Sequence, residues 1–281
     1  MNPSLFREKE YAIEKVKKPK KLMVIGGGVA GMQSAKTAAE RGHSVTLYEA
    51  DEQLGGAWNI AAAQPQKELY LNLIRQLTSG MKTAGVKVVL NKRADIDLAK
   101  REKSDAVIVA TGAKPATLPI PGVNGPNVVQ AVDIITGKAN TGSSVVVIGG
   151  RMIGMETALY LAEQGKKVSL ITLKRLGENG KKLEETLYRT LRDRMIKHDI
   201  QIFPGTPAVE IRPDGVFAND DGRLFWLGGE TVVLAVGYRP ENGIVQELKG
   251  IVPEVYNIGD CNGPRDGLDA TREGMEIGLR V

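Results

Sequence analysis

The chain has 281 residues, of which 42% are hydrophobic and 25% are charged, so its length and composition suit two globular domains. Its single cysteine, two histidines and lack of an 18-residue apolar run predict no internal disulfide, no cysteine- or histidine-built metal centre and no membrane span. The leader is charged and has no apolar core, which argues against a secretory signal and indicates the cytoplasm.

The net charge of +5 is concentrated near the N-terminus, where lysines occupy five of the seven positions 15–21. Aromatic residues make up only 5% of the chain, and they do not alternate with basic residues as in proteins that stack nucleic-acid bases. We therefore expect no nucleic-acid partner. Residues 1–19 are predicted to form an N-terminal arm that lies on the outside of the molecule or against a partner.

The first predicted elements are a strand at residues 21–25, a glycine-rich turn, a helix at residues 32–41 and a strand at residues 44–49. They are followed by a predicted helix at residues 68–83 and predicted strands at residues 87–90 and 105–110. Residues 115–126 are rich in proline and glycine and are predicted to form a linker.

The first turn has the spacing Gly26-x-Gly28-x-x-Gly31, and Glu49 ends the following strand 21 residues after Gly28. In a dinucleotide-binding turn, the first glycine makes the tight bend and the second lets the backbone approach a pyrophosphate. The third lets helix and strand pack closely, and the acid accepts hydrogen bonds from ribose hydroxyls. The context of strand, turn, helix and acid therefore predicts a dinucleotide site here.

The same architecture occurs twice in the chain. Residues 24–49 align with residues 147–172 at an offset of 123 positions without a gap, and residues 107–115 resemble residues 232–240. Repetition of a strand–turn–helix unit at this separation indicates an α/β fold of two doubly wound, Rossmann-like domains.

In the second copy, residues 181–198 are predicted to form a long helix, with short strands between residues 201 and 235. A last strand at residues 255–258 and a helix at residues 266–281 have no domain of their own, so we expect them to return to the first sheet. The prediction is a first domain of residues 20–115 and 241–281, with residues 116–240 inserted in it.

The second turn departs from the fingerprint at one position. Gly149 and Gly154 keep the first and third glycines, but Arg151 stands where Gly28 stands in the first copy. The position of Glu49 is taken by Thr172, so the ribose-binding carboxylate is missing. Two alternatives are open: Arg151 swings out and pairs with phosphate, or it blocks the site.

Lys174 and Arg175 follow directly after the position of the missing acid. Two cations at this place suit an adenosine 2′-phosphate, which favours NADP over NAD as the ligand of the second domain.

Three segments resemble flavoprotein disulfide-reductase-like folds: residues 54–58 (LGGAW), residues 110–112 (ATG) and Gly259-Asp260 after the last predicted strand. The whole chain is similar to the C-terminal half of the old-yellow-enzyme-related reductases, which include 2,4-dienoyl-CoA reductase, 2-enoate reductase and trimethylamine dehydrogenase. This closer resemblance lies in residues 2–8 (NPSLFRE), 55–61 (GGAWNIA), 258–261 (IGDC) and 269–273 (DATRE). Ala57 replaces the glutamine that the family usually has in its loop.

The resemblance implies that the first domain binds FAD and the inserted domain binds NADP or NAD. The residues expected to bind FAD are Gly26, Gly28, Val29, Ala30, Gly31, Glu49, Gly56, Trp58, Ala110, Thr111, Gly112, Gly259 and Asp260. The residues expected to bind NAD(P) are Gly149, Arg151, Met152, Ile153, Gly154, Lys174 and Arg175. No catalytic side chain is predicted, because the cofactor would carry the chemistry.

The resemblance also implies a function. In long family members a TIM barrel with FMN and a 4Fe-4S segment precede these domains, so the barrel and cluster look cut away or encoded elsewhere. One hypothesis is an FAD-dependent oxidoreductase module that takes hydride from NAD(P)H and passes electrons to such a barrel/iron–sulfur domain or subunit, with diaphorase activity when isolated. The other is a non-catalytic docking module that holds FAD or ADP as a structural part.

Overall fold

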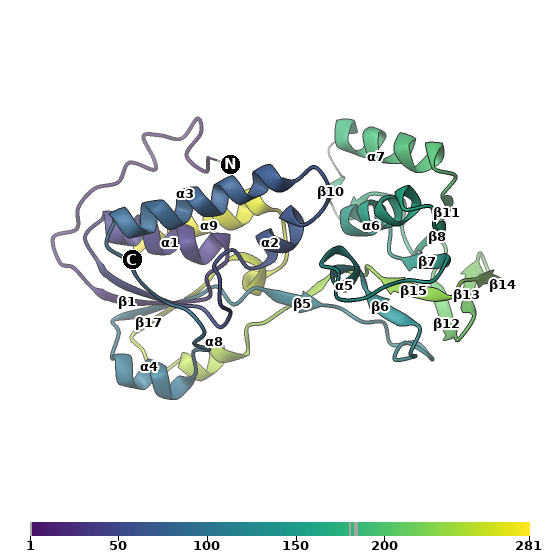
Figure 1. The fold of residues 1–281 in the computed structure, drawn as a ribbon. Coiled ribbons are helices and arrows are strands. Elements are labelled where there is room, and N and C mark those ends of the chain that lie inside the picture. Colours follow the sequence, from purple (N-terminus) through teal and green to yellow (C-terminus); the bar gives the residue numbers. More distant parts are fainter. Residues whose placement is uncertain (1, 180, 183–184) are drawn as a thin grey trace. The chain divides into compact units, whose positions relative to one another are not determined.

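The computed structural model describes residues 2–179, 181–182 and 185–281. The chain divides into two compact units (Figure 1). The first unit runs to Lys114 and resumes at Arg239–Val281, and the second is Pro115–Tyr238. The two chain crossings between them, β5 (Ala113–Pro115) and β16 (Tyr238–Pro240), pair as a two-stranded sheet.

The first unit is built on a parallel five-stranded sheet in the order β17-β4-β1-β2-β3. Its strands are β1 (Lys21–Ile25), β2 (Ser44–Tyr48), β3 (Lys87–Val89), β4 (Ala106–Val109) and β17 (Glu254–Asn257). Because β17 pairs with β4, the last strand of the chain belongs to the first sheet, as expected.

Helices cover both faces of this sheet (Figure 1). One face carries α1 (Val29–Glu40), α3 (Leu71–Thr83) and α9 (Gly267–Arg280), and the other carries α4 (Ile96–Glu102) and α8 (Gly243–Leu248). Each layer has its own apolar core, since β1 and β4 are buried on both sides. Two short elements lie between β2 and α3 in the chain: α2 (Ala57–Ala62) and the 3₁₀ turn η1 (Glu68–Tyr70).

The second unit repeats this plan. Its parallel sheet has the order β11-β8-β7-β15-β6. The strands are β6 (Val128–Gln130), β7 (Ser144–Ile148), β8 (Lys167–Thr172), β11 (Gln201–Pro204) and β15 (Thr231–Leu234). One face packs against α5 (Ala131–Ile135), α6 (Met152–Glu163) and α7 (Glu185–Lys197). The other packs against an antiparallel sheet of β12 (Ala208–Arg212), β13 (Gly215–Asp220) and β14 (Arg223–Gly228).

Two parallel five-stranded sheets, one in a unit inserted into the other, confirm the fold expected from the repeat. Several helix boundaries differ from the expectation. Residues 68–70 of the helix expected at residues 68–83 form η1, and α9 is one residue shorter at each end than expected. Helix α1 begins at Val29, three residues early, because Gly28 already has extended N-cap geometry. Helix α7 begins at Glu185, and Lys181–Lys182 instead forms β10, which pairs with β9 (Glu178–Asn179). Residues 183–184 of the expected helix lie outside the described residues.

Helix α9 lies very close to α1, and small residues make this possible. A Cβ on Gly274 would overlap the carbonyl oxygen of Ala30, and a Cβ on Gly278 would lie 2.7 Å from the Cβ of Thr37. This approach brings the segment before α9 to the start of α1, where a Cβ on Gly259 would lie 2.8 Å from the Cβ of Ala30.

Two side chains in the α1–β2 connection hold the end of α9. The Arg41 guanidinium donates to the carbonyl oxygens of Gly278, Leu279 and Val281. His43 is buried, its Nδ1 accepts the Lys20 backbone N–H at 3.0 Å and its Nε2 lies 3.0 Å from the Val281 oxygen. Burial lowers the pKa of His43, which favours the neutral imidazole.

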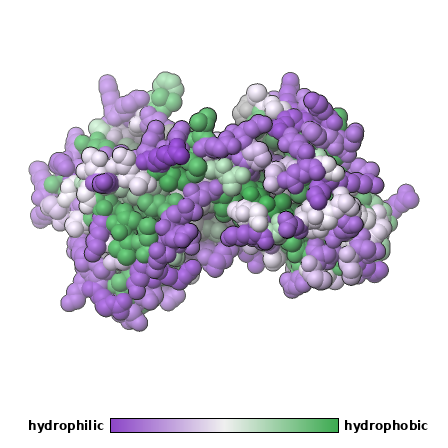
Figure 2. Space-filling view, viewed as in Figure 1, coloured by the Kyte–Doolittle hydropathy of each residue, from purple (hydrophilic) through white to green (hydrophobic). Residues whose placement is uncertain are grey.

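The N-terminal arm lies along the first unit. Tyr11 is buried and its hydroxyl donates to Glu276 on α9 at 2.5 Å, while the Val16 N–H donates to the Arg41 oxygen. Figure 2 shows hydrophilic side chains over most of the visible face of each unit, with smaller apolar areas between them. Within the described part of the chain, no helix is long and apolar enough to cross a bilayer.

Candidate functional site

The three glycines of the first turn differ in what surrounds them. Gly26 has φ +106°, and a Cβ there would overlap the carbonyl oxygen of Ala110. A Cβ on Gly31 would overlap the carbonyl oxygen of Gly26. A Cβ on Gly28, in contrast, would meet nothing within 4 Å. The first and third glycines are therefore required by the fold, whereas the second borders open space.

A second loop lies against this turn. Gly28 pairs with Gly55 in an isolated parallel bridge, and the Gly55 N–H donates to the Gly27 oxygen at 2.8 Å. A Cβ on Gly56 would lie 3.3 Å from the Gly28 Cα. The sequence-predicted residues Gly28 and Gly56 are thus brought together, with the backbone of both loops close to the same space.

Trp58 follows this loop on α2, but its indole is engaged in packing. Its ring stacks on Tyr70 with centroids 5.0 Å apart, and its Nε1 donates to the Tyr70 carbonyl oxygen at 2.8 Å. This contact fixes α2 against η1. The structure therefore gives Trp58 a structural role in addition to the predicted cofactor contact.

Glu49 stands beside the first turn, as expected from its position at the end of β2. It is buried, Oε2 accepts the Gly27 N–H at 2.6 Å and Oε1 accepts the Asp51 N–H at 2.9 Å. These two backbone donors fix the carboxylate and compensate for its burial. Each oxygen keeps a lone pair that can accept a further hydroxyl.

On the other side of Gly26, the end of β4 continues into Ala110, Thr111 and Gly112. The Thr111 hydroxyl donates to the Glu241 carbonyl oxygen, and the Gly112 oxygen accepts the Glu241 N–H at 2.9 Å. Gly112 has φ +74°, and a Cβ there would meet nothing within 4 Å. These three predicted residues therefore line the strand ends next to the turn.

Asp260 lies in the 3₁₀ turn η2 (Gly259–Asn262), which the α1–α9 packing places at the start of α1. Burial raises the pKa of its carboxyl, although the Arg265 N–H that it accepts at 3.4 Å opposes this shift. The neighbouring thiol of Cys261 is buried and donates to the Val109 and Ile258 oxygens, and burial raises its pKa. Cys261 is thus a packed thiol and is not activated as a nucleophile.

Glu273 organises this turn, but the sequence named it only as the last residue of the DATRE segment and gave it no role. Its Oε2 accepts the Gly259 N–H at 2.7 Å, and its Oε1 accepts from Asn262 and from the Arg265 guanidinium. Glu273 lies one helical turn after Asp269 on α9. From the sequence alone, a second carboxylate at this spacing is typical of a solvent-exposed helix face. Only the fold shows that it holds the backbone next to Asp260.

The second turn keeps the structural glycines. A Cβ on Gly149 would overlap the Ala235 oxygen, and a Cβ on Gly154 would overlap the Gly149 oxygen. Arg151 is the N-cap of α6, and its Nη1 lies 3.4 Å from where a Cβ on Gly237 would be. The guanidinium thus lies over Gly237 in the turn after β15. Of the next two predicted residues, Met152 is exposed and Ile153 packs against the core.

The loop after β8 is tied to this turn. The Gly177 N–H donates to the Gly150 oxygen at 2.7 Å, and a Cβ on Gly150 would lie 2.8 Å from the Thr172 Cβ. Lys174 and Arg175, in the same loop, are exposed. Among the described residues, no group of three or more His, Cys, Asp or Glu side chains could hold a metal ion.

The fold and its two turns define a class: an oxidoreductase with tandem dinucleotide-binding folds. The profile of the pyridine nucleotide-disulphide oxidoreductase family matches residues 20–277, and the chain belongs to this family. Members typically bind FAD and NAD(P)H. Thioredoxin reductase of Lactococcus lactis, at 20% identity and a TM-score of 0.71 over 93% of this chain and 97% of its own, shares the fold.

Closer relatives are longer proteins. The chain is 33% identical to a metal reductase of Desulforamulus reducens and 32% identical to a cinnamate reductase of Clostridium sporogenes. All of the chain is aligned in both, but only 47% and 42% of the relatives. The structure of 2-naphthoyl-CoA reductase in complex with 2-naphthoyl-CoA has a TM-score of 0.91 at 32% identity, over 100% of this chain and 43% of that one. The chain corresponds to the FAD/NAD-binding portion of enoate-reductase-like enzymes and spans less than half of their length.

Proposed function

We propose that the chain is an FAD-dependent oxidoreductase module that takes hydride from NAD(P)H and passes electrons onward. The observation that carries the proposal is the open space at Gly28, bounded by the Gly55-Gly56 loop and by the fixed carboxylate of Glu49. Bound there, FAD would supply a two-electron carrier between a nicotinamide and a further acceptor.

The residues of the first unit fit the phosphates and sugars of such a dinucleotide. Helix α1 has no side-chain cap, so its first N–H groups, including those of Val29, Ala30 and Gly31, are available to phosphate oxygens. Glu49 would accept from ribose hydroxyls, and Asp260 would bind the hydroxyls of the ribityl chain.

The second unit would hold the nicotinamide dinucleotide. Its turn has the same structural glycines, Gly149 and Gly154, and α6 likewise begins without a side-chain cap. Lys174 and Arg175 would meet the adenosine end. In this proposal the Arg151 side chain partly blocks the pyrophosphate path and leaves Gly237 when the ligand enters.

The partner is proposed to be a TIM-barrel domain or subunit with FMN and a 4Fe-4S cluster. Two observations support a partner: the relatives are more than twice as long as the aligned portion, and they include reductases of cinnamate and 2-naphthoyl-CoA. The isolated chain would then transfer electrons only to artificial acceptors.

A second candidate function is a docking module without turnover, which holds FAD or ADP as a structural part. The observation that favours it is Arg151, whose guanidinium lies over Gly237 where a dinucleotide would pass.

Anaerobic reduction separates the two functions. The chain is reconstituted with FAD, desalted and titrated with NADPH and NADH while the flavin absorbance is recorded. Bleaching of the flavin band is the result expected for the oxidoreductase module. A flavin that stays oxidised with both nucleotides would instead support the docking module. A protein that retains no FAD would contradict the oxidoreductase module and would leave ADP as the ligand of the docking module.

A further inference from the structure

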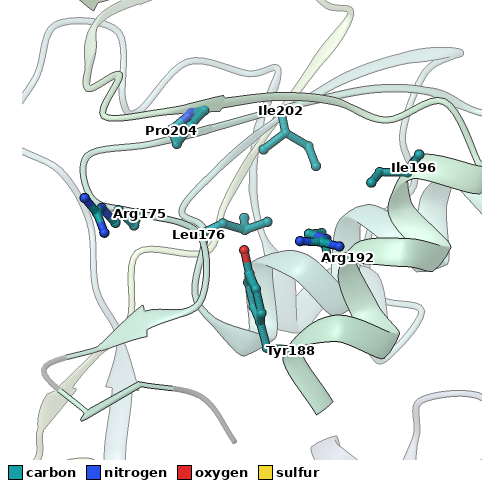
Figure 3. A pocket seen from close by; sticks show the side chains of 7 residues that line it. All are labelled: Arg175, Leu176, Tyr188, Arg192, Ile196, Ile202 and Pro204. Carbon is teal, nitrogen blue, oxygen red and sulfur yellow. The ribbon is translucent and has the colours of Figure 1, made fainter. Parts of the chain in front are cut away.

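The second unit exposes two apolar features outside its glycine turn. One is a cavity of about 390 Å³ beside β11, lined by side chains of the loop after β8, helix α7 and β11 (Figure 3). Because Arg175 lines it, this cavity belongs to the loop that the proposed function assigns to the nucleotide. The other feature is the antiparallel sheet β12-β13-β14, which covers the face of the parallel sheet opposite α5, α6 and α7.

The two edges of this antiparallel sheet differ. Edge strand β12 is covered by the linker before β6, since its Ile211 N–H donates to the Pro121 oxygen and its Arg212 oxygen accepts from the Asn127 amide, both at 2.9 Å. On the other side, β14 pairs only with β13 within the described part of the chain. Proteins usually protect such an edge with lysine, proline or a covering segment, but β14 has the sequence RLFWLG. Strand β14 is therefore an unprotected edge.

The hairpin geometry determines which backbone groups of β14 point outward. Strands β13 and β14 are joined by the two-residue loop Asp221-Gly222, in which both residues have positive φ. In this type of hairpin the two flanking residues exchange both N–H···O bonds, and every second pair along the strands does the same. The Gly229 N–H continues this alternation, since it donates to the Asp214 oxygen at 2.9 Å. The residues whose N–H and C=O groups point away from β13 are therefore Leu224, Trp226 and Gly228.

The side chains of the outer face are exposed, whereas the inner face is packed. Leu224 is 59% exposed and Trp226 is 37% exposed, and the Trp226 ring contacts Phe217 of β13 with centroids 4.8 Å apart. On the inner face, Phe225 contacts Phe203 of β11 with ring centroids 5.6 Å apart. The parallel sheet thus holds β14 in place while its outer face presents two apolar side chains.

The outward groups of β14 are complementary to those of a second copy. Antiparallel pairing about a two-fold axis at Trp226 places Trp226 opposite itself and Leu224 opposite Gly228 of the copy. The residues with outward backbone groups then meet one another, so donors and acceptors pair in register. A Cβ on Gly228 would have no contact closer than 3.8 Å, so this position has room for the Leu224 side chain of the copy. Phe217 and Trp226 of both copies would form one row of four aromatic rings.

The charges of the strand also fit a second copy. Residues 224–228 are uncharged, so this register brings no like charges opposite each other. Arg223, the one charged residue of β14, comes opposite Gly229 of the copy and next to its exposed carboxylate Glu230. Charge complementarity therefore favours the same register as the backbone groups.

We infer that the chain forms a homodimer through β14, in which two three-stranded sheets join into one antiparallel sheet of six strands. The contact is small, on the order of 1,000 Å² of total buried surface, which is typical of a weak and reversible interface. The dimer is independent of the proposed function, because none of the residues assigned to a cofactor lies on β14.

Sedimentation equilibrium of the full chain tests the inference. We expect the wild type to show a monomer–dimer equilibrium between about 1 and 300 µM, as a weak interface requires. A wild-type chain that remains monomeric over this range would overturn the homodimer and would leave the edge to a strand of another protein.

Two charged variants test the register. Trp226→Lys and Trp226→Glu each place like charges opposite each other across the two-fold axis, so each should weaken association by at least about tenfold. Mixed in equal amounts, the two variants should form a heterodimer, because opposite charges then face each other. This rescue requires that residue 226 meets itself. Association of Trp226→Lys as strong as that of the wild type, or a mixture that stays monomeric, would overturn the inference.

Val209→Lys is the matched control. Val209 is 38% exposed on β12, the edge that the linker covers, so this change should leave association unchanged. Leu224→Lys is a second variant for the case in which circular dichroism shows that the Trp226 variants do not fold. Its side chain is more exposed than that of Trp226, and it should weaken association as well. A folded Leu224→Lys protein that associates like the Val209→Lys control would overturn the pairing through β14.

Discussion

The two glycine turns of this chain share one backbone plan and differ at its middle position. In both, a Cβ on the first or third glycine would overlap a backbone carbonyl oxygen. The middle position is Gly28 in the first turn, where space is open, and Arg151 in the second, where a guanidinium lies over Gly237. The comparison separates the glycines that the fold requires from the middle glycine, which the fold does not require.

The comparison also explains why a departure from the fingerprint need not disturb the fold. Arg151 caps α6 with extended backbone geometry, φ −79° and ψ 178°, close to the φ −69° and ψ 174° of Gly28. Any residue can adopt this conformation. The middle position is thus free to vary in the folded state, and its side chain decides what can approach the strand ends.

The largest expected effect comes from the third glycine of the turn, which the fold requires in both units. Gly31→Ala should reduce the free energy of unfolding of the first unit by about 3 kcal/mol, because its Cβ would overlap a carbonyl oxygen that is held inside the turn. Urea unfolding followed by Trp58 fluorescence, in a Trp226→Phe background, reports the first unit. The control Gly243→Ala adds a Cβ that meets nothing within 4 Å and should change stability by less than about 1 kcal/mol. Equal effects of the two changes would contradict the packing role.

Gly28→Arg copies the second turn into the first. The fold should remain, since a Cβ there meets nothing within 4 Å, but the long side chain would occupy the space assigned to the pyrophosphate. We expect the affinity for FAD to fall by about two decades, measured by fluorescence titration, with an unchanged circular dichroism spectrum. Full FAD affinity in a folded Gly28→Arg protein would place the pyrophosphate elsewhere.

Arg151→Gly makes the opposite change in the second turn. If the side chain partly blocks the path, as we propose, the affinity for NADPH should rise by up to about tenfold and flavin reduction should accelerate. If Arg151 instead pairs with phosphate, removal of a contact worth about 1.5–3 kcal/mol would lower the affinity by one to two decades. Titration of the wild type and of Arg151→Gly with NADPH therefore shows whether the affinity rises or falls. A tenfold loss of affinity would contradict partial blockage.

The smallest expected effect concerns the residue directly before β2 in the first unit and before β8 in the second. His43 in the first unit aligns with Lys166 in the second, whose Nζ donates to the Thr141 oxygen at 3.2 Å. Because burial lowers the pKa of His43 below the ordinary value of 6.5, its contribution to stability is complete above about pH 6.5 and is lost as the pH falls.

Urea unfolding at several pH values tests this difference. The first unit, followed by Trp58, should lose stability below about pH 6.5, and His43→Gln should flatten that dependence. The second unit, followed by Trp226 in a Trp58→Phe background, is the internal comparison. A first unit whose stability does not respond to His43→Gln across this range would contradict the assignment.

Much of this architecture could be predicted from the sequence, because its signals are local or repeated. The glycine spacing and the acid at Glu49 lie within one strand–turn–helix–strand unit, and the 123-residue offset identifies the second unit. The return of β17 and α9 to the first sheet also followed, since the last elements had no other partner.

What could not be predicted depends on contacts between distant segments or on side-chain direction. Glu273 binds the Gly259 N–H only because α9 lies on α1, which depends on Gly274 and Gly278. The direction of the Arg151 guanidinium has no signature in the sequence. The β9–β10 pairing replaced the first turn of an expected helix because lysines at positions 181–182 are compatible with either element.

The most direct test of the central claim is the amount of FAD that each protein retains. The wild-type chain, Gly28→Arg and Arg151→Gly are reconstituted with FAD and desalted, and flavin per chain is measured by absorbance. The account predicts one FAD per chain for the wild type and for Arg151→Gly, and almost none for folded Gly28→Arg. A colourless wild-type chain, or a Gly28→Arg protein that keeps its flavin, would contradict it.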